Sequence, residues 1–385
     1  MIYLDYNATT PLDKEVLEAM LPYLEDVYGN PSSTYAFARK SRKAIDEARQ
    51  KAASFLGAEP DEIIFTSGGT ESDNTAIKGV SFARLPKKGS IITSSIEHHA
   101  VLNSVKSLEK FGFECKYLNV DEFGLIDLGR LKDYLGPDTI LVSVMYANNE
   151  VGTIEPVKDI VRLCRDKGIY VHTDAAQAAG KIKIDVKELD VDFLSLSAHK
   201  LYGPKGVGVL YAKRGVKFEP LLHGGRHEKN RRASTENVAG IVGLGKALEI
   251  ARSRMDDEER NIRILRDKLQ NGILERIPEV KLNGHPDKRL YNTLNVCIKY
   301  IEGEGMLTHL DFEGVCASSG SACTSGSLEP SHVLLAMGIP HELAHGSLRF
   351  SLGKYNTESE IDRVLEIFPP IVEKLRSMSP FWNGK

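Results

Sequence analysis

The stretch Phe193-Leu194-Ser195-Leu196-Ser197-Ala198-His199-Lys200-Leu201-Tyr202-Gly203-Pro204 decides how this chain folds around its site. A short apolar run ends in small polar residues, a lysine and a Gly-Pro break, which predicts a buried strand with Lys200 at its carboxyl end. Most lysines lie on solvated surfaces. A lysine held at a strand end inside a site can lose its proton and form a Schiff base with a carbonyl. Lys200 therefore points to Schiff-base chemistry.

The segments around this stretch alternate between strand-like and helix-like patterns. The expected strands are 62–66, 90–93, 140–146, 169–173, 193–197 and 207–211. The expected helices between them include 72–83, 100–111 and 157–167. Alternation of this kind predicts an α/β fold whose large sheet is mainly parallel and is covered by helices on both faces.

The pattern changes near residue 255. An amphipathic stretch at 238–255 continues into a charged helix at 256–277. Later strands are expected at 294–300, 315–318 and 348–352, and later helices at 331–337 and 358–375. A chain of 385 residues is long enough for two domains. We therefore predict an N-terminal segment and large domain over 1–255 and a smaller α+β domain over 256–385.

Composition and charge narrow the class of protein. Charged residues make up 27% and hydrophobic residues 42% of the chain, as is usual for a soluble protein, and the net charge is only -3. That charge predicts neither a nucleic-acid partner nor an anionic-membrane partner. No apolar stretch approaches the ~20 residues of a membrane helix, and the first residues lack the pattern of a signal peptide. We expect a cytoplasmic protein.

Five cysteines are present, an odd number with no Cys-x-x-Cys pair, so neither a disulfide framework nor an ordinary zinc site is expected. Cys115, Cys164 and Cys297 lie in apolar runs and are expected to be inert. Cys323 differs because it lies in a run of small residues, 317–327, which predicts an exposed and mobile loop. An exposed thiol can ionise and react, whereas a buried one is inert.

The residues that follow the expected strands are candidates for one common binding site, because ligands of open α/β sheets bind outside the carboxyl ends of the strands. Five strand ends carry polar or ionisable groups, so the sequence predicts a site at this edge. The groups include Gly69, Thr70, His98, Asn149, Asp174, Gln177, Ser197, His199 and Lys200.

These groups suit the parts of pyridoxal phosphate (PLP), the best-known partner of a Schiff-base lysine. The Gly-rich turn 67–70 opens a helix whose free N–H groups favour a phosphate. Asp174 could pair with the protonated pyridine nitrogen, and Gln177 and Asn149 could donate to the ring O3′. His98 could stack on the ring and move protons.

Each of these features also has a structural explanation when it is taken alone. The glycine turn could be plain helix entry, Asp174 could be a helix N-cap, and a lone histidine such as His98 is usually structural. Only the combination at one sheet edge favours a cofactor.

The chain resembles the cysteine desulfurases of the NifS/IscS group, within the class V aminotransferase family. The similarity runs almost end to end, which makes chance agreement negligible. It is carried by Tyr3-Leu4-Asp5-Tyr6-Asn7-Ala8-Thr9-Thr10-Pro11, Gly29-Asn30-Pro31-Ser32-Ser33, Thr66-Ser67-Gly68-Gly69-Thr70-Glu71-Ser72-Asp73-Asn74, Glu97-His98-His99-Ala100, Ala147-Asn148-Asn149-Glu150, Asp174-Ala175-Ala176-Gln177, His199-Lys200-Leu201-Tyr202-Gly203-Pro204-Lys205-Gly206, Ser318-Ser319-Gly320-Ser321-Ala322-Cys323 and Arg349-Phe350-Ser351-Leu352-Gly353. The resemblance implies the PLP-dependent transferase fold of type I, which is the aspartate aminotransferase-like fold.

The resemblance also implies roles for single residues. Lys200 would carry PLP, Asp174 would hold the pyridinium, and His98 would stack on the ring. Gln177 would contact O3′. The phosphate would be held by Gly69, Thr70, Ser197 and His199.

Two further roles involve a second subunit and the substrate. Thr235 matches a threonine that reaches the phosphate of the neighbouring subunit, which implies a homodimer. Asn149 and Arg349 would bind the substrate carboxylate. Alternation in 347–351 places Arg349 on the polar face with the serines, where a guanidinium can bind a carboxylate through two hydrogen bonds. Without the other motifs, we would expect Arg349 to be an ordinary surface arginine.

The reaction implied by the resemblance depends on Cys323. L-Cysteine would react at PLP, Lys200 would move the α-proton, and His98 would shuttle protons. The Cys323 thiolate would attack the substrate sulfur, giving L-alanine and a persulfide. The long loop resembles that of enzymes that pass sulfur to IscU- or NifU-like iron–sulfur scaffold proteins. It leaves open a transient [2Fe-2S] cluster that Cys323 would ligate together with such a scaffold.

Three alternatives stay open. A selenocysteine lyase would use the same residues, and the sequence does not separate sulfur from selenium substrates. Another class V PLP enzyme, such as an aminotransferase, would have no need of Cys323. A non-enzymatic dimeric scaffold that accepts sulfur would have no need of Lys200, Asp174 and His98.

Overall fold

The computed structural model of the chain describes residues 1–319 and 329–382. Its largest feature is a seven-stranded sheet in the order β2-β8-β7-β6-β5-β3-β4. All neighbouring strands are parallel except that β8 runs antiparallel to both β2 and β7. The strands are β2 (Ile63–Thr66), β3 (Ser90–Ser94), β4 (Glu114–Leu118), β5 (Thr139–Ser143), β6 (Tyr170–Asp174), β7 (Phe193–Ser197) and β8 (Gly208–Ala212).

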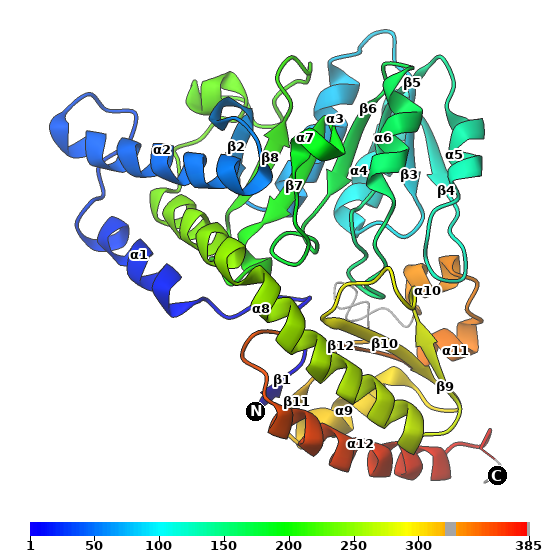
Figure 1. Cartoon of the computed structure of the whole chain (residues 1–385). Coiled ribbons are helices and arrows are strands. Elements are labelled where there is room, and N and C mark those ends of the chain that lie inside the picture. The colour runs from blue at the N-terminus through cyan, green and yellow to red at the C-terminus, as the bar shows by residue number, and fades with distance from the viewer. Residues whose placement is uncertain (320–328, 383–385) are drawn as a thin grey trace.

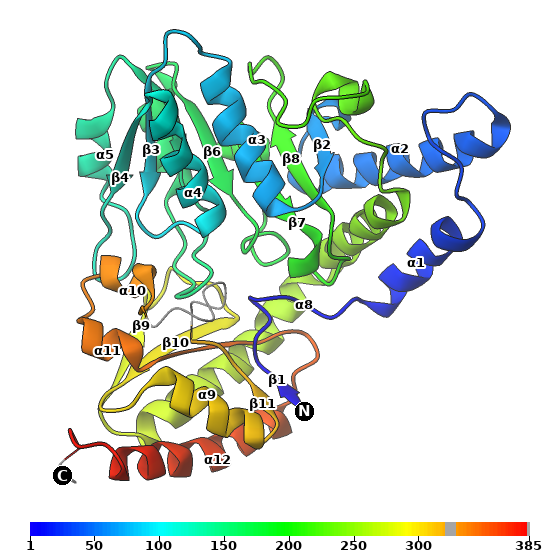
Figure 2. The same cartoon turned by 180° about the vertical axis from the view of Figure 1, so that it is seen from behind.

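Helices cover both faces of this sheet, as Figures 1 and 2 show from opposite sides. Alternate residues of one strand enter different cores: Ile64 packs with α3 and α4, whereas Ile63 and Phe65 pack with α2 and α8. Because both faces are covered, β5 and β7 are buried at every residue. The helices of this part are α1 (Lys14–Glu25), α2 (Ala36–Leu56), α3 (Gly69–Phe82), α4 (His99–Leu108), α5 (Leu128–Tyr134), α6 (Val157–Arg165) and α7 (Val186–Leu189).

One long helix, α8 (Val238–Arg276), runs from the large sheet to the lower part of the molecule in Figure 1. Its first half contributes Ile241 and Leu248 to the core of the large sheet, whereas its second half contributes Ile262 and Leu269 to a separate core. The stretches expected at 238–255 and 256–277 are therefore one continuous helix. We keep the domain boundary near residue 255 as a proposal.

The second core lies under a three-stranded antiparallel sheet in the order β12-β10-β9. The strands are β9 (Val280–Asn283), β10 (Thr293–Ile298) and β12 (Ser347–Ser351), and the helices are α9 (Gly303–Phe312), α10 (His332–Ala336), α11 (His341–His345) and α12 (Glu358–Ser377). A two-residue strand at the N-terminus, β1 (Ile2–Tyr3), pairs in parallel with β11 (Val315–Cys316). The first residues of the chain thus contact this smaller unit.

Three strands, β1, β4 and β9, were not predicted from the sequence. Strand β1 has only two residues, and β4 and β9 lie at sheet edges and carry polar residues such as Lys116 and Lys281, so none has the continuous apolar run that identified the buried strands. Within residues 1–319 and 329–382, no helix combines the length and the apolar character that crossing a membrane requires.

Candidate active site

Five strands, β2, β3, β5, β6 and β7, run in the same direction, so their carboxyl ends meet at one edge of the large sheet. A cavity of about 410 Å³ lies at this edge, within the usual size of small-molecule sites. It is lined by ten of the predicted site residues: Gly69, Thr70, His98, Asn149, Asp174, Gln177, Ser197, His199, Lys200 and Arg349.

Lys200 ends a short 3₁₀ turn, Ala198–Lys200, that follows β7 directly. Its Nζ donates hydrogen bonds to the backbone oxygens of Asn7 and Ala8, the second at 2.8 Å. The N-terminal segment therefore lies over the lysine although it is 192 residues away in the sequence. This placement keeps the amine inside the cavity.

The glycine turn between β2 and α3 forms one end of the cavity. Gly68 has φ +153° and precedes α3, and no side chain in the described part of the chain caps the start of this helix. The turn can approach β8 because Gly208 has no side chain: a Cβ there would lie 2.7 Å from Gly68 Cα. Free N–H groups and the helix dipole make this end suitable for a phosphate.

Polar side chains surround the same end. Ser197 lies close to the turn, because a Cβ built on Gly69 would lie 3.7 Å from the Cβ of Ser197. His199 is held by Thr9 Oγ1 at 3.1 Å from its Nδ1. Burial, with the charges of Lys200 and Lys205, lowers the pKa of His199 to about 4, so the imidazole is neutral near pH 7.

Asp174 ends β6 as a buried carboxylate. Its Oδ1 accepts a hydrogen bond from Ala176 N at 2.8 Å. Burial raises the pKa of Asp174, and the hydrogen bond from Ala176 N and the nearby basic groups His98 and Lys200 oppose that rise. A buried carboxylate needs an opposite charge. A protonated ring nitrogen would supply it.

His98 caps the start of α4, where its Nδ1 accepts a hydrogen bond from Ala100 N at 3.2 Å. In the neutral ring, the proton is therefore on Nε2. Burial lowers the pKa of His98 more than Asp174 raises it. His98 is thus a neutral imidazole whose Nε2–H can donate to a ligand.

Gln177 stands beside Asp174 and has unused hydrogen-bonding capacity. Its Nε2 donates to Asn7 O at 2.9 Å, while its buried Oε1 has no partner among the described residues. Buried polar atoms are rarely left in this state. A ligand hydroxyl in the cavity could donate a hydrogen bond to this oxygen.

Arg349 reaches the cavity from β12, with only 2% of its surface exposed. One of its terminal nitrogens donates to Asn149 O at 2.9 Å, and the other to Asp5 Oδ1 at 2.7 Å. Ser347 and Ser351 share its face of the strand, while Leu348 and Phe350 enter the core. The predicted alternation is therefore confirmed, and Arg349 is not a surface residue.

Two predicted site residues are not in this cavity. Thr235 is exposed and lines a separate cavity of about 200 Å³, together with Ser67 and Arg232. Cys323 lies outside the residues that the structure describes, so its predicted mobile loop and its predicted cluster ligation both stay predictions.

Nine cavity residues were not predicted as site residues, among them the polar residues Asn7, Asp73 and His332. Asn7 contacts Lys200 and Gln177 through its backbone oxygen, and no pattern of side chains in the sequence indicates such a contact. Asp73 lies on α3, where burial strongly raises the pKa of its carboxyl. The ring of His332 lies 4.7 Å from that of His99. The Ser72-Asp73-Asn74 motif was a usable signal for Asp73.

The groups of this cavity fit PLP. The α3 end suits its phosphate, Asp174 suits the ring nitrogen, and the unpartnered Gln177 Oε1 can accept a hydrogen bond from a ring hydroxyl. Lys200 supplies an amine for the aldehyde.

Comparisons with known proteins agree with this geometry. Residues 2–364 match the family Aminotransferase class-V. The chain is 57% identical over 379 residues to "Cysteine desulfurase IscS" of Methanosarcina thermophila, covering 98% of this chain and 94% of that protein. The solved structure "NIFS-LIKE PROTEIN" has a TM-score of 0.92 at 41% identity, covering 97% of this chain and all of that one. The structure "SspA in complex with cysteine" has a TM-score of 0.82 at 38% identity, covering 93% and 100%.

Proposed function

The chain belongs to the class-V aminotransferase family, and within it we infer that the protein is a PLP-dependent cysteine desulfurase acting on L-cysteine. The observation that carries this function is the single cavity that gathers Lys200, Asp174 and His98. The chain shares the fold of its relatives as well as their sequence similarity.

PLP, when bound, supplies an electron sink for the electron pair left by a broken bond at the substrate Cα. Asp174 stabilises the protonated ring nitrogen, which that function requires. Gln177 would contact the ring oxygen, and His98 would stack on the ring. Gly69, Thr70, Ser197 and His199 would hold the phosphate.

Lys200 and His98 move protons. Lys200 has its amine inside the cavity and takes the proton from the substrate Cα. The Nδ1 atom of His98 accepts a hydrogen bond from Ala100 N at 3.2 Å, so Nε2 carries the proton that the neutral ring can donate. Because burial lowers the pKa of His98, the ring is neutral at the start of the reaction.

Arg349 and Asn149 orient the substrate. Arg349 is buried with a rigid guanidinium, and its Nε has no partner among the described residues. That nitrogen, with the half-buried Asn149 amide, can receive the substrate carboxylate. The carboxylate then holds the amino acid with its Cα towards Lys200.

Cys323 completes the reaction in this proposal. Its thiolate attacks the sulfur of L-cysteine, the substrate C–S bond breaks and an S–S bond forms. The products are L-alanine and the Cys323 persulfide, so all atoms and electrons of one cysteine and one thiol are accounted for. The small residues around Cys323 support this role, because an exposed thiol can reach both the site and an outside acceptor.

The protein's partners belong to the same proposal. A homodimer is supported by Thr235, which is exposed and apart from the cavity of its own chain, so it can serve a neighbouring one. An iron–sulfur scaffold protein would take the sulfur, with a transient [2Fe-2S] cluster shared through Cys323. Sedimentation analysis, alone and with an IscU-like protein, measures both associations.

The function is tested by supplying L-cysteine and measuring alanine and protein-bound persulfide together. The wild-type protein should carry a visible PLP absorbance band and form both products. Lys200→Ala should lose the band and the turnover. Cys323→Ser should keep the band, because Cys323 does not hold the cofactor, but lose alanine production.

A wild-type protein that takes up no PLP would contradict the cofactor assignment. Normal turnover by Cys323→Ser would remove Cys323 from the mechanism while leaving the cofactor assignment intact. The matched control is Cys115→Ser, since Cys115 is a half-buried thiol whose pKa burial raises to about 11.

A further inference from the structure

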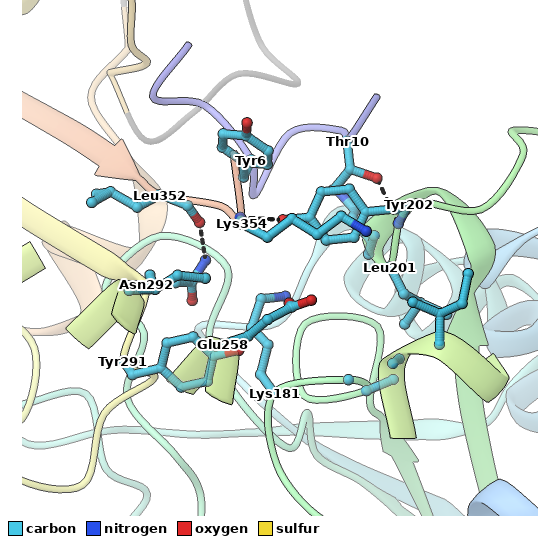
Figure 3. A pocket seen from close by; sticks show the side chains of 16 residues that line it. Tyr6, Thr10, Lys181, Leu201, Tyr202, Glu258, Tyr291, Asn292, Leu352 and Lys354 are labelled. Atoms are coloured by element: carbon cyan, nitrogen blue, oxygen red, sulfur yellow. Dashed lines mark hydrogen bonds between the residues drawn. The ribbon is translucent and has the colours of Figure 1, made fainter. Parts of the chain in front are cut away.

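A small cavity lies behind Lys200, where the N-terminal segment, α8 and both units of the chain meet (Figure 3). Its volume is about 30 Å³, enough for one or two water molecules. Lys200 lines both this cavity and the candidate active site. The groups of the small cavity can therefore act on the lysine without lining the active site. They include Lys181, Tyr202, Glu258 and Lys354.

Tyr202 lines this cavity two residues after Lys200, in a backbone conformation that large residues rarely adopt, with φ +60°. Such a conformation persists only where the surrounding contacts hold it. Its N–H donates to Thr10 Oγ1 at 2.8 Å, and its carbonyl oxygen accepts from Asp13 N at 3.0 Å. Its hydroxyl accepts from Lys354 N at 2.8 Å. The chain just after Lys200 is therefore held by two other segments.

Lys354 follows β12 in the smaller unit and contacts both other units of this contact region. Its Nζ forms an ion pair with Asp13, and the two side chains are only 8% and 6% exposed. The same nitrogen lies 4.2 Å from the centroid of the Tyr202 ring, a favourable cation–π contact. Burial raises the pKa of Asp13, but the hydrogen bonds from Lys354 and Glu15 N outweigh this and bring the pKa below its ordinary value, so the carboxylate is charged near pH 7. Lys354, Asp13 and Tyr202 are called the Lys354 cluster below.

The N-terminal segment 6–13 connects the Lys354 cluster to the amine of Lys200. Lys200 Nζ donates to two backbone oxygens of this segment. Further along the segment, Thr10 N donates to His199 O at 3.0 Å, so the segment runs across the turn that carries Lys200. The segment ends at Asp13, the N-cap of α1. The Lys354 cluster therefore fixes the end of the segment whose middle holds the lysine amine.

We propose that Lys354 is a positioning residue for Lys200: through the Lys354 cluster it fixes segment 6–13 between the two units, so that the two backbone oxygens keep the Lys200 amine in place. This inference rests on the proposed role of Lys200 in moving the proton of the substrate Cα. A group that moves a proton must be held within hydrogen-bond reach of its target, so a displaced segment slows the chemical step. Substrate binding should change little, because the proposed function assigns the substrate carboxylate to Arg349 and Asn149.

The first measurement follows segment 6–13 directly. Hydrogen exchange of the full-length, PLP-containing protein is read by mass spectrometry in the peptide that covers this segment. Lys354→Met removes the charge and keeps a long side chain. We expect the protected amides of Thr10 and Asp13 to exchange about tenfold faster, because local opening of the segment becomes easier. Lys354→Arg should restore slow exchange, because arginine keeps both the ion pair and the contact with the Tyr202 ring.

A second variant attacks the same ion pair from its other side. Asp13→Asn removes the charge but keeps the N-cap of α1, because asparagine caps helices about as well as aspartate. It should also speed the exchange of the segment, and adding Lys354→Met should cause little further increase, since both changes break one contact. Asp13→Asn replaces Lys354→Met if circular dichroism shows that the lysine variant misfolds. The matched control is Lys374→Met, at an exposed lysine of α12, which should exchange like the wild type.

The second measurement is the steady-state formation of alanine from L-cysteine, expressed per PLP-containing site. Lys354→Met should lower kcat about tenfold with KM unchanged, because the amine is misplaced while the carboxylate contacts remain. Lys354→Arg should recover kcat. A residue that only stabilised the fold would leave kcat per loaded site unchanged, so the split between kcat and KM separates positioning from a purely structural role.

Unchanged exchange in both Lys354→Met and Asp13→Asn overturns the inference, as does faster exchange in Lys354→Met without any loss of kcat. Hydrogen exchange requires no turnover. A protein inactive on L-cysteine that shows the expected exchange would support the contact between Lys354 and segment 6–13 and contradict the proposed function alone. An active protein without these effects would contradict only the role of Lys354.

Discussion

Arg349 is the residue whose substitution best separates substrate binding from cofactor binding. Its guanidinium contacts Asp5 and Asn149 O, and its Nε has no partner within residues 1–319 and 329–382. Lysine keeps the charge but cannot make these contacts and also hold a carboxylate. We expect Arg349→Lys to raise the KM for L-cysteine about tenfold or more, equivalent to at least ~1.4 kcal/mol of binding, with the PLP absorbance unchanged.

Steady-state alanine formation measures this effect. Arg363→Lys, at an arginine of α12 whose side chain is 47% exposed, is the matched control and should retain the wild-type KM. An unchanged KM in Arg349→Lys would show that the substrate carboxylate binds elsewhere.

The position of a site residue in the fold was predictable where its neighbours in the sequence determine it. Lys200, Asp174 and His98 each lie at or just after the end of a strand whose apolar run and turn residues are local, so their position at one edge was predictable. The burial of Arg349 was not predictable from its strand alone, because Asp5 and Asn149 come from distant parts of the chain.

At the scale of elements, the contact between the glycine turn and β8 sets the start of α3. Gly208 pairs with Thr66 of β2 and with Ser197 of β7. A Cβ at Gly208 would lie 2.7 Å from both Gly68 Cα and Leu196 O, and backbone atoms cannot move aside easily. We expect Gly208→Ala to cost about 1–3 kcal/mol of stability and to weaken PLP binding.

Urea unfolding and a PLP titration of the cofactor-free protein measure the two effects. Gly136→Ala is the control, because a Cβ at Gly136 would meet no atom within 4 Å. If both variants bind PLP equally well, the close approach of the turn to β8 is not what shapes the phosphate end.

The elements themselves were predictable to different degrees. Continuous apolar runs predict buried strands such as β7, and β7 was predicted with its observed bounds. Edge strands β4 and β9 carry polar residues and depend on a neighbour for their hydrogen bonds. Their existence follows from pairing, which local periodicity does not contain.

For the whole molecule, buried histidines make stability depend on pH. His172 is fully buried between Ser143 Oγ at 2.8 Å and Ser195 Oγ at 2.9 Å, and burial lowers its pKa to about 3. Between that value and the unfolded value near 6.5, the unfolded chain binds a proton that the folded chain does not. Stability therefore falls as pH falls through this window, by up to ~1.4 kcal/mol per pH unit from this group.

Buried carboxylates act in the opposite direction. Burial raises the pKa of Glu97 and Glu155 to about 8, so their contribution falls as pH rises from 4.5 to 8. The histidine effect must therefore be measured as a difference. We expect the stability difference between wild type and His172→Gln to shrink as pH falls from about 6.5 to about 4.5 in urea unfolding.

His341→Gln is the control for that series, because the His341 side chain is 56% exposed and should give a difference that does not vary with pH. A constant difference for His172→Gln as well would mean that His172 is protonated in the folded protein.

The sequence by itself determined the large parallel sheet, the strand ends that carry the site and the cofactor that those ends suit, because apolar runs, turns and the residues after them are local properties. Only the tertiary structure placed the oxygens of Asn7 and Ala8 on Lys200, buried Arg349, and brought Lys181 and Glu258 into one cavity behind that lysine. These contacts join segments far apart in the chain. They depend on how α8 and the N-terminal segment pack across both cores, which no local pattern specifies.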